Sequence, residues 1–237
     1  MRRLLFIALA ALLLMTGCAA SPAAEPAGRP VIVLVDLSGS TAAVASTYRQ
    51  QAQTIINSLK GGEHLLVLPI SSSSLTATAA VDLRFPAYRR FTTNEFTHGR
   101  AMKKARDEAL AKVDAMLTAP RTESARRTAI IDGLLQAQDL LGGQPGTICI
   151  ISDMVEDSDL ARFEALTDEA IPTLLETIGS RKPAFPAGTK VHVAGLSAAG
   201  NYLEPARVLT IRRFWEAFFA EAGAELIGYG PEFHNLK

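Results

Sequence analysis

Apolar runs of strand length alternate along this chain with segments whose apolar residues recur at helical spacing. The run VIVLVDL, residues 31–37, is continuous, rich in β-branched residues and bounded by turn residues. Such a run is typical of a strand that is covered on both faces. Further strands are predicted at HLLVLPIS, TATAAVDLRF, TICIIS, KVHVAGL and AELIGYG, and we expect TATAAVDLRF to lie at an edge of the sheet.

The segments between these runs predict helices. The first has apolar residues at helical spacing and stops at KGG, and these residues are Val44, Tyr48, Ala52, Ile55, Ile56 and Leu59. Further helices are predicted at about 99–117, at 129–141 before two glycines, and at about 158–179 with a division at Pro172. The last helix has a stripe formed by Ile211, Phe214, Trp215, Phe218, Phe219 and Ala222. We interpret this stripe as core rather than as a ligand pocket.

This alternation predicts the class of fold. Parallel strands need crossover connections, which are usually helices, so the pattern predicts an α/β fold. We expect a doubly wound, mostly parallel central sheet with helices on both faces. Residues 30–237 contain no linker-like segment and no internal repeat, so we expect them to form one domain.

Composition and charge narrow the function classes. The chain has 237 residues, of which 48% are hydrophobic and 20% are charged, as in an ordinary globular protein. Its formal net charge is +0, so no overall basicity indicates binding to nucleic acid.

The amino-terminal segment predicts export. Arg2 and Arg3 precede an apolar run, Leu4 to Met15, which has the length of a signal-peptide core and is too short to span a membrane. The run ends in LLLMTGC, which resembles a bacterial lipoprotein signal. That resemblance implies a signal peptide at residues 1–17, a lipidated Cys18 and an Ala- and Pro-rich tether at 18–29. The alternative is an ordinary secretory signal that is cleaved within GCAASPAA.

Both alternatives place the mature chain outside the cytoplasm. With the lipid, we expect it to be anchored in the cell envelope at Cys18, facing the periplasm or the cell surface. Cys149 then has no partner in the chain, and its apolar run TICIIS predicts a buried thiol.

Candidate chemistry begins where the first predicted strand ends. Asp36, Ser38 and Ser40 alternate along the chain, so their side chains can project to one side, and Gly39 allows a tight turn between the serines. The carboxyl ends of parallel strands are where open α/β sheets bind their ligands. Hydroxyl and carboxylate oxygens suit Mg²⁺, or Mn²⁺ and Ca²⁺ less strictly. The alternative is that Ser40 or Thr41 is the N-cap of the following helix.

Two further pieces favour the metal site. A threonine stands where a helix begins in RRTAIIDGLLQAQDLL, and a buried strand ends in an aspartate in CIISDMVEDSD. Together the pieces resemble the von Willebrand factor A domain and its metal-ion-dependent adhesion site. They occur in the family's order and on its elements, with Asp36, Ser38 and Ser40 after the first strand, Thr128 before a helix and Asp153 after the fourth strand. Met154 stands where the family often has glycine, so we expect that loop to be shaped differently.

The resemblance implies how the site would work. Ser38, Ser40 and sometimes Thr128 would bind the metal directly, whereas Asp36 and Asp153 would act largely through bound water. Few anionic groups would then touch the cation, which would keep an open position for an Asp or Glu carboxylate from a partner protein. Such a site binds and does not catalyse.

Two other classes of function compete with adhesion, and the first of them is catalysis. A phosphotransferase of the haloacid dehalogenase type also has a strand that ends in aspartate, but it needs a second acid where Ser38 stands. An aspartic protease needs contiguous Asp-Ser-Gly, which Leu37 interrupts. No metalloprotease spacing connects the four histidines, which we expect at the surface or at strand edges: His64, His98, His192 and His234. The other competing function is that of a metal-free scaffold lipoprotein with the same fold.

The chain also contains a basic stretch. From Arg84 to Arg127 there are eleven Lys or Arg residues against five Asp or Glu residues. One interpretation is a solvated helix face with charge pairs four residues apart. The other is a surface, around Arg100, Lys103 and Lys104, that docks an acidic partner or anionic lipid headgroups beneath the tether.

Overall fold

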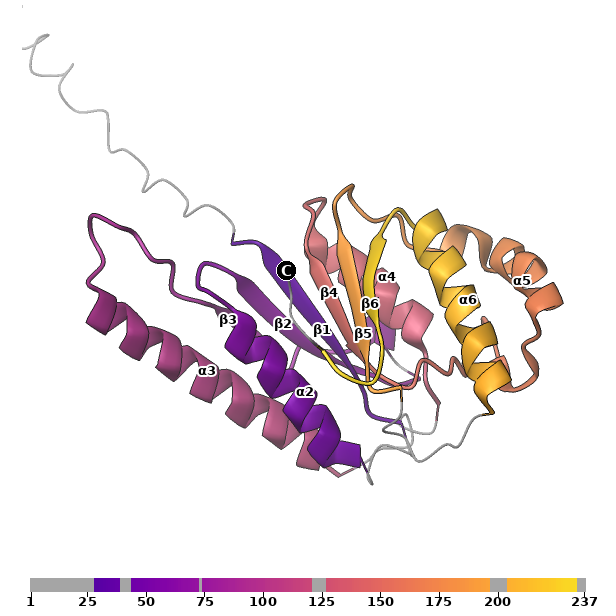
Figure 1. The fold of residues 1–237 in the computed structure, drawn as a ribbon, viewed down its shortest axis with the longest axis horizontal. Helices are drawn as coiled ribbons and strands as arrows, with labels where there is room; N and C mark the ends of the chain where they lie inside the picture. Colours follow the sequence, from indigo (N-terminus) through magenta and orange to yellow (C-terminus); the bar gives the residue numbers. More distant parts are fainter. Residues whose placement is uncertain (1–27, 39–43, 73, 121–126, 197–203, 234–237) are drawn as a thin grey trace, which may run out of the picture.

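The computed structural model describes residues 28–38, 44–72, 74–120, 127–196 and 204–233, drawn in colour in Figure 1. The strands are β1 (Pro30–Asp36), β2 (His64–Ile70), β3 (Val81–Arg84), β4 (Thr147–Ile151), β5 (Lys190–Ala194) and β6 (Glu225–Tyr229). The α-helices are α2 (Ala45–Ser58), α3 (Glu95–Thr118), α4 (Ile130–Leu141), α5 (Ile171–Ile178) and α6 (Pro205–Glu221). The predicted signal peptide, Cys18, Ser40 and Thr41 lie outside the described residues.

The strands form one sheet in the order β3-β2-β1-β4-β5-β6. All neighbouring pairs are parallel except β2 and β3, so β3 is an antiparallel edge strand. This confirms the predicted α/β fold with its mostly parallel sheet and the edge position of the third strand. The strand order reverses between β1 and β4, where an open α/β sheet has its ligand crevice.

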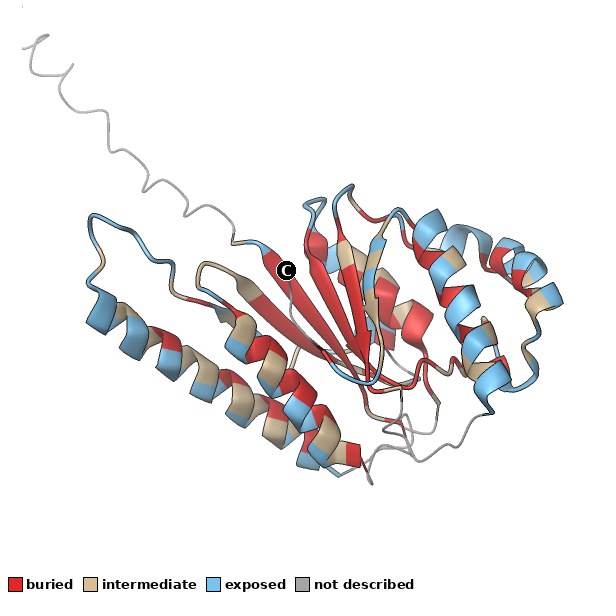
Figure 2. Ribbon diagram, in the orientation of Figure 1, coloured by how far each residue is buried: buried red, intermediate tan, exposed pale blue. Residues whose placement is uncertain are grey.

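Helices cover both faces of the sheet, as Figure 1 shows. Successive side chains of a strand point to opposite faces, so β1 contributes to two cores. Val31, Val33 and Val35 pack with α2 and α3, whereas Ile32 and Leu34 pack with α4, α5 and α6. Figure 2 shows the buried sheet between helices whose outer faces are exposed. Burial of β1 on both faces explains why its sequence is apolar without alternation.

Most of the predicted helices are present, and their apolar faces are buried as expected. All six apolar residues of the first pattern are buried against the sheet, and so is the whole stripe of the last helix. The Trp215 indole N–H donates to the Met154 carbonyl oxygen over 2.9 Å, so this ring is core with its polar atom satisfied. Helix α4 ends at Gly142, whose φ of 58° is the left-handed conformation predicted for a glycine at this position.

Three expectations were wrong in detail. Pro172 does not divide a helix but lies in the first turn of α5, where a residue without an N–H loses no hydrogen bond. The preceding residues form two short 3₁₀ helices, 163–165 and 168–170. Helix α3 begins at Glu95, four residues early, because Asn94 caps it by accepting from two backbone N–H groups. His192 is buried within β5 rather than exposed.

Cys149 lies on β4 as a buried free thiol, in agreement with the expected buried position. Burial raises the pKa of this thiol well above its usual range, which makes it unreactive. Within the described residues, no helix is both long and apolar enough to cross a bilayer.

Candidate functional site

The candidate site lies where β1 and β4 end side by side. Their parallel pairing aligns Val35 with Ile151, so the next residues, Asp36 and Ser152, are neighbours at the carboxyl edge of the sheet. The Ser152 hydroxyl donates to Asp36 Oδ2 over 2.8 Å. The backbone N–H of Ser38 donates to Asp36 Oδ1, also over 2.8 Å, which begins the turn that follows β1.

Two carboxylates lie near each other at this edge. Asp36 is 1% exposed and Asp153 is 9% exposed. The pKa of Asp36 is raised to about 6, mainly by burial and in smaller part by the nearby Asp153, against the opposing hydrogen bonds from Ser38 and Ser152. Asp153 Oδ1 accepts the backbone N–H of Val155 over 3.0 Å. This edge therefore concentrates negative charge in a poorly solvated place, which favours the binding of a cation.

Tyr48, on α2, lies near this pair of acids. Its side chain is fully buried, and its hydroxyl has no hydrogen-bond partner among the described residues. Burial raises the pKa of Tyr48, and Asp36 and Asp153 raise it further, so the phenol stays protonated and can only donate or accept as a neutral group. A Cβ atom at Gly195 would lie 3.2 Å from the Tyr48 ring, so the glycine makes room for it.

Ser152 and Tyr48 were missed by sequence reasoning. The signal for Ser152 was its place between an apolar run and Asp153 in IISDM. Tyr48 looked like an ordinary member of a helical stripe, and only the packing of α2 on the sheet brings its hydroxyl to the acids.

The loop after β4 has a glycine-like backbone although it contains Met154. This residue has a φ of 65°, the one positive φ at a non-glycine residue in the described ranges. Its N–H donates to the Ser152 hydroxyl oxygen, and its carbonyl accepts from Trp215. Its side chain is fully buried in the core formed with α6. Packing and two hydrogen bonds thus hold a conformation that costs about 1 kcal/mol or more for a residue with a Cβ atom.

Thr128 lies at the same edge, between the loops that follow β2 and β4. Its carbonyl oxygen accepts the Asp157 N–H over 2.9 Å, while the next residue, Ala129, donates to the Ser71 carbonyl oxygen over 3.3 Å. The Thr128 side chain is buried. The structure thus brings Asp36, Ser38 and Asp153 together and places Thr128 nearby, whereas Ser40 lies outside the described residues.

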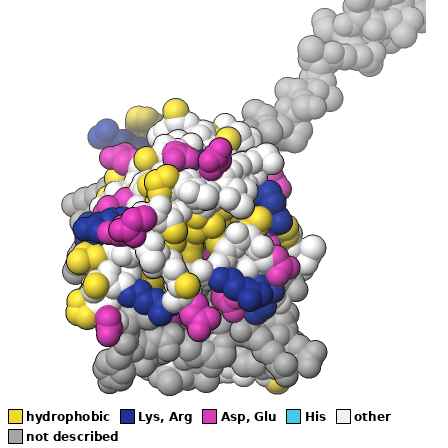
Figure 3. All heavy atoms as spheres, turned by 90° about the vertical axis from the view of Figure 1, so that its right-hand side faces the viewer, with side chains coloured by type: hydrophobic (Ala, Val, Ile, Leu, Met, Phe, Trp, Pro, Cys, Tyr) yellow, Lys and Arg dark blue, Asp and Glu magenta, His cyan; other side chains and the backbone are white. Residues whose placement is uncertain are grey.

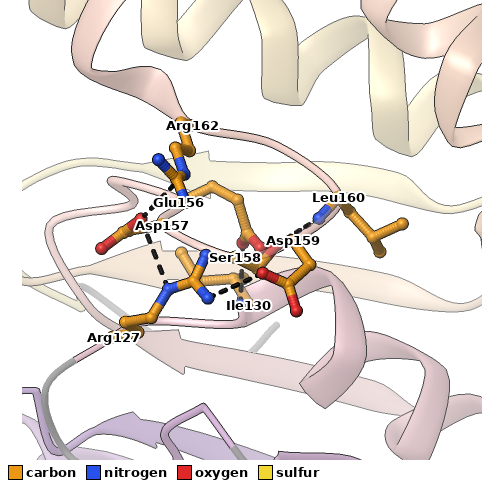
Figure 4. A network of polar contacts seen from close by, with 8 residues as sticks. All are labelled: Arg127, Ile130, Glu156, Asp157, Ser158, Asp159, Leu160 and Arg162. Atoms are coloured by element: carbon orange, nitrogen blue, oxygen red, sulfur yellow. Dashed lines mark hydrogen bonds and ion pairs between the residues drawn. The ribbon is translucent and has the colours of Figure 1, made fainter.

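Glu156 holds the Thr128 loop against the loop after β4. Glu156 Oε2 accepts the N–H groups of Ile130 and Ile131, at the start of α4, over 2.8 and 3.2 Å. Figure 4 shows this contact beside Arg127, which reaches toward Asp157 and Asp159. Burial raises the pKa of Glu156 to about 8, although these hydrogen bonds oppose the shift.

A cavity of about 630 Å³ adjoins this network and is lined in part by Glu156, Arg127 and Arg207. None of Asp36, Ser38 and Asp153 lines it. In the described ranges, no group of three or more His, Cys, Asp or Glu side chains has the arrangement of a metal site. Any cation at the β1–β4 edge would therefore need hydroxyl oxygens in addition to the two carboxylates.

The basic residues of the possible docking surface lie away from the candidate site. Arg100, Lys103 and Lys104 are on the amino-terminal half of α3, which Figure 1 shows at the end of the molecule opposite to the carboxyl ends of β1 and β4. Lys103 forms an ion pair with Asp107 over 2.5 Å, in agreement with a helix face that has charge pairs four residues apart.

The fold and this edge define a doubly wound α/β domain with a candidate ligand site at its switch point. No protein-family model matches the chain, and no curated protein matches it. Among solved structures, it is similar to a von Willebrand factor type A protein from Catenulispora acidiphila, with a TM-score of 0.42, 15% identity and coverage of 83% of this chain and 42% of that one.

Two further solved structures are similar. One is the pilus adhesin SpaC from Lactobacillus rhamnosus GG in an open conformation, with a TM-score of 0.46, 14% identity and coverage of 85% of this chain and 28% of that one. The other is the human COPII-coat protein Sec24c, with a TM-score of 0.40, 7% identity and coverage of 86% and 30%. The chain spans less than half the length of each of these three proteins.

Replacing Met154 tests the strain in the loop after β4. We expect both Met154→Gly and Met154→Ala to lower the free energy of unfolding, because each empties a buried site. Glycine tolerates a positive φ, so Met154→Gly should be the more stable of the two variants by about 1 kcal/mol. Urea denaturation measures the difference. Alanine at least as stable as glycine would show that this backbone is unstrained.

Glu156 predicts a pH dependence of stability. Its pKa rises from 4.5 to about 8 on folding, so its favourable contribution is complete below pH 4.5 and is lost as the pH rises through 8. Across that window the wild type should lose up to about 1.4 kcal/mol per pH unit from this group, and Glu156→Gln should not. Thermal unfolding of both proteins between pH 5 and 8.5 measures this. A constant difference between their midpoints would contradict the raised pKa.

Proposed function

We propose that this chain is an exported cell-envelope lipoprotein whose von Willebrand factor A-like domain binds a protein partner through a divalent cation. The observation that supports this most directly is the meeting of Asp36, Ser38 and Asp153 at the switch point between β1 and β4. The cation is Mg²⁺, or Mn²⁺ or Ca²⁺, because the available donors are hard oxygens. The role is adhesion or assembly and is not catalytic.

The chemistry of the residues fits such a cation. The burial that raises the pKa of Asp36 opposes its charged form, and a bound cation would relieve that cost. The unpartnered Tyr48 hydroxyl beside the two acids could bond to water on the metal. Ser38, Ser40 and Thr128 would supply direct ligands, while Asp36 and Asp153 would act through water.

This ligand set explains recognition of an acidic partner. Neutral hydroxyls in direct contact leave most of the cation's charge uncompensated. An Asp or Glu carboxylate from the partner would therefore be attracted to an open position on the metal. After removal of the signal peptide at 1–17, the lipid on Cys18, at the start of the tether at 18–29, would keep the domain at the envelope.

A metal-free scaffold is the second candidate, and one observation favours it. Both oxygens of Asp36 already accept hydrogen bonds within the protein, from Ser38 and Ser152. The acid could thus serve only to join the ends of β1 and β4. A Mg²⁺-dependent phosphotransferase is less well supported, because the second acid that its chemistry requires is replaced by Ser38.

Calorimetric titration of the chain with Mg²⁺ separates these functions. We expect saturable binding that Ser38→Ala weakens by about tenfold or more, because a direct ligand is lost. Ser72→Ala is the matched control, since Ser72 is an exposed serine just beyond β2 at the same edge. No heat with any of the three divalent ions would favour the scaffold. Phosphatase activity that Asp36→Asn abolishes would favour the enzyme.

Partner binding is tested with detergent-solubilised envelope passed over the immobilised chain. We expect a retained protein that chelator releases and that Ser38→Ala fails to retain, because the partner's carboxylate needs the metal. Ser72→Ala should retain it normally. Retention that is unchanged by chelator would contradict a metal-mediated contact.

A further inference from the structure

Exposed aromatic rings gather at one end of the domain. Phe91 is 96% exposed, Phe96 is 72% exposed and Tyr88 is 45% exposed. These are the only exposed large aromatic side chains in the described residues, and they lie within nine positions of one another. Isolated exposed apolar residues are ordinary, but three bulky rings exposed within one short segment indicate a binding surface. We call residues 88–104, which contain all three rings, the 88–104 surface.

The same surface is basic. Residues 88–104 contain five Lys or Arg residues and one acid, Glu95. The Arg100 guanidinium lies over the Phe96 ring at 5.8 Å from its centre. The face of α5 and α6 differs, because basic and acidic side chains alternate on it, as in the ion pairs Arg212–Glu216 and Arg213–Asp168. Figure 3 shows the two signs of charge side by side on that face.

Local hydrogen bonds hold the rings outward. The Thr92 and Thr93 N–H groups both donate to the Arg89 carbonyl oxygen, which forms a turn with Phe91 inside it. Asn94 then caps α3, so Phe96 stands in the first turn of a helix. Tyr88 packs edge-on against His98. Because the turn and helix are already ordered, the rings would lose little conformational entropy when they bind another surface.

The tether begins at this end of the molecule. Gly28, where the described chain starts, packs so closely on Gly62 that a side chain would collide with the Gly62 carbonyl oxygen. On its other side, Gly62 donates to the Phe85 carbonyl oxygen over 3.0 Å and lies against Ala87. Gly28 and the 88–104 surface thus flank the same short loop. Gly28 follows Cys18 by ten positions, a distance along the chain that reaches at most about 35 Å.

We propose that the 88–104 surface docks on an anionic lipid bilayer. Phe91 and Phe96 enter the headgroup region, where aromatic rings are favoured, while Arg89, Arg90 and Arg100 lie against lipid phosphates. The inference deepens the proposed function, because a lipid on Cys18 would hold this surface within reach of the membrane. Docking itself requires neither the lipid nor a metal. It would turn the β1–β4 edge, at the opposite end, away from the bilayer.

Vesicle co-sedimentation tests docking without the anchor. The chain from residue 19 onward keeps the entire described domain and has no lipid site. In EDTA, we expect it to bind vesicles of phosphatidylcholine with about one third phosphatidylglycerol, and to bind pure phosphatidylcholine at least tenfold more weakly. High salt should release it. Equal binding to both vesicles, or binding to neither, would overturn the proposal. Binding to neither is also the result expected if this surface binds an acidic protein instead.

Matched variants locate the contact. Phe91→Ser and Phe96→Ser should each weaken binding on the order of tenfold, while Leu209→Ser, which removes an exposed apolar side chain on α6, should not. Arg90→Glu should weaken binding by about fivefold or more. Lys112→Glu is its control, since Lys112 lies twelve residues beyond Arg100, about 18 Å along α3. Equal effects of test and control variants would overturn the location.

A tryptophan reports insertion directly. Trp215 is the chain's one tryptophan and is buried, so its emission gives a constant background. In Phe91→Trp, we expect a blue shift on anionic vesicles and quenching by brominated lipid, and in Leu209→Trp neither. Absence of both signals in Phe91→Trp would overturn insertion. Because EDTA is present throughout, failure here leaves the metal-dependent function untouched, and loss of Mg²⁺ binding would leave docking untouched.

Discussion

The parallel pairing of β1 with β4 is the constraint on which the candidate site depends. Its register aligns Val35 with Ile151, and the chain leaves both strands at the same level. Asp36 and Ser152 therefore meet through one 2.8 Å hydrogen bond, with Asp153 close by. Both strands are buried on each face, so slippage by one residue would turn every side chain to the wrong core. Core packing thus determines the position of the acids.

The site takes support from both cores. Tyr48 reaches it from α2 on one face, while Trp215 on α6 fixes the Met154 carbonyl from the other. Burial of Asp36 and the positive φ of Met154 each cost stability, and the surrounding hydrogen bonds and packing offset that cost. Such local costs concentrate at functional sites. Where the hydrogen-bonding and charged groups of a site are already compensated within the protein, a ligand has little free energy to add. The unpartnered Tyr48 hydroxyl belongs to the same pattern.

A parallel sheet also gives the domain two chemically different ends. The parallel strands all begin at one edge of the sheet and end at the other, so the described chain enters β1 from the edge opposite to Asp36. The antiparallel strand β3 returns the chain to the edge at which β1 begins, where the turn around Phe91 and the start of α3 follow. Topology alone therefore separates the surface proposed to face a bilayer from the site proposed to face a protein.

The sequence by itself determined the α/β alternation, all six strands and the main helices, because burial on one or two faces leaves a periodic record along the chain. It also brought forward Asp36, Ser38 and Asp153, since residues at strand ends share an edge. Only the tertiary structure decided the partners of Asp36, the position of Tyr48 near the acids and the hydrogen bonds from the start of α4 to Glu156. Those contacts join residues far apart in sequence, such as Asp36 with Ser152 and Glu156 with Ile130. No local pattern records a distance that arises when separate elements pack.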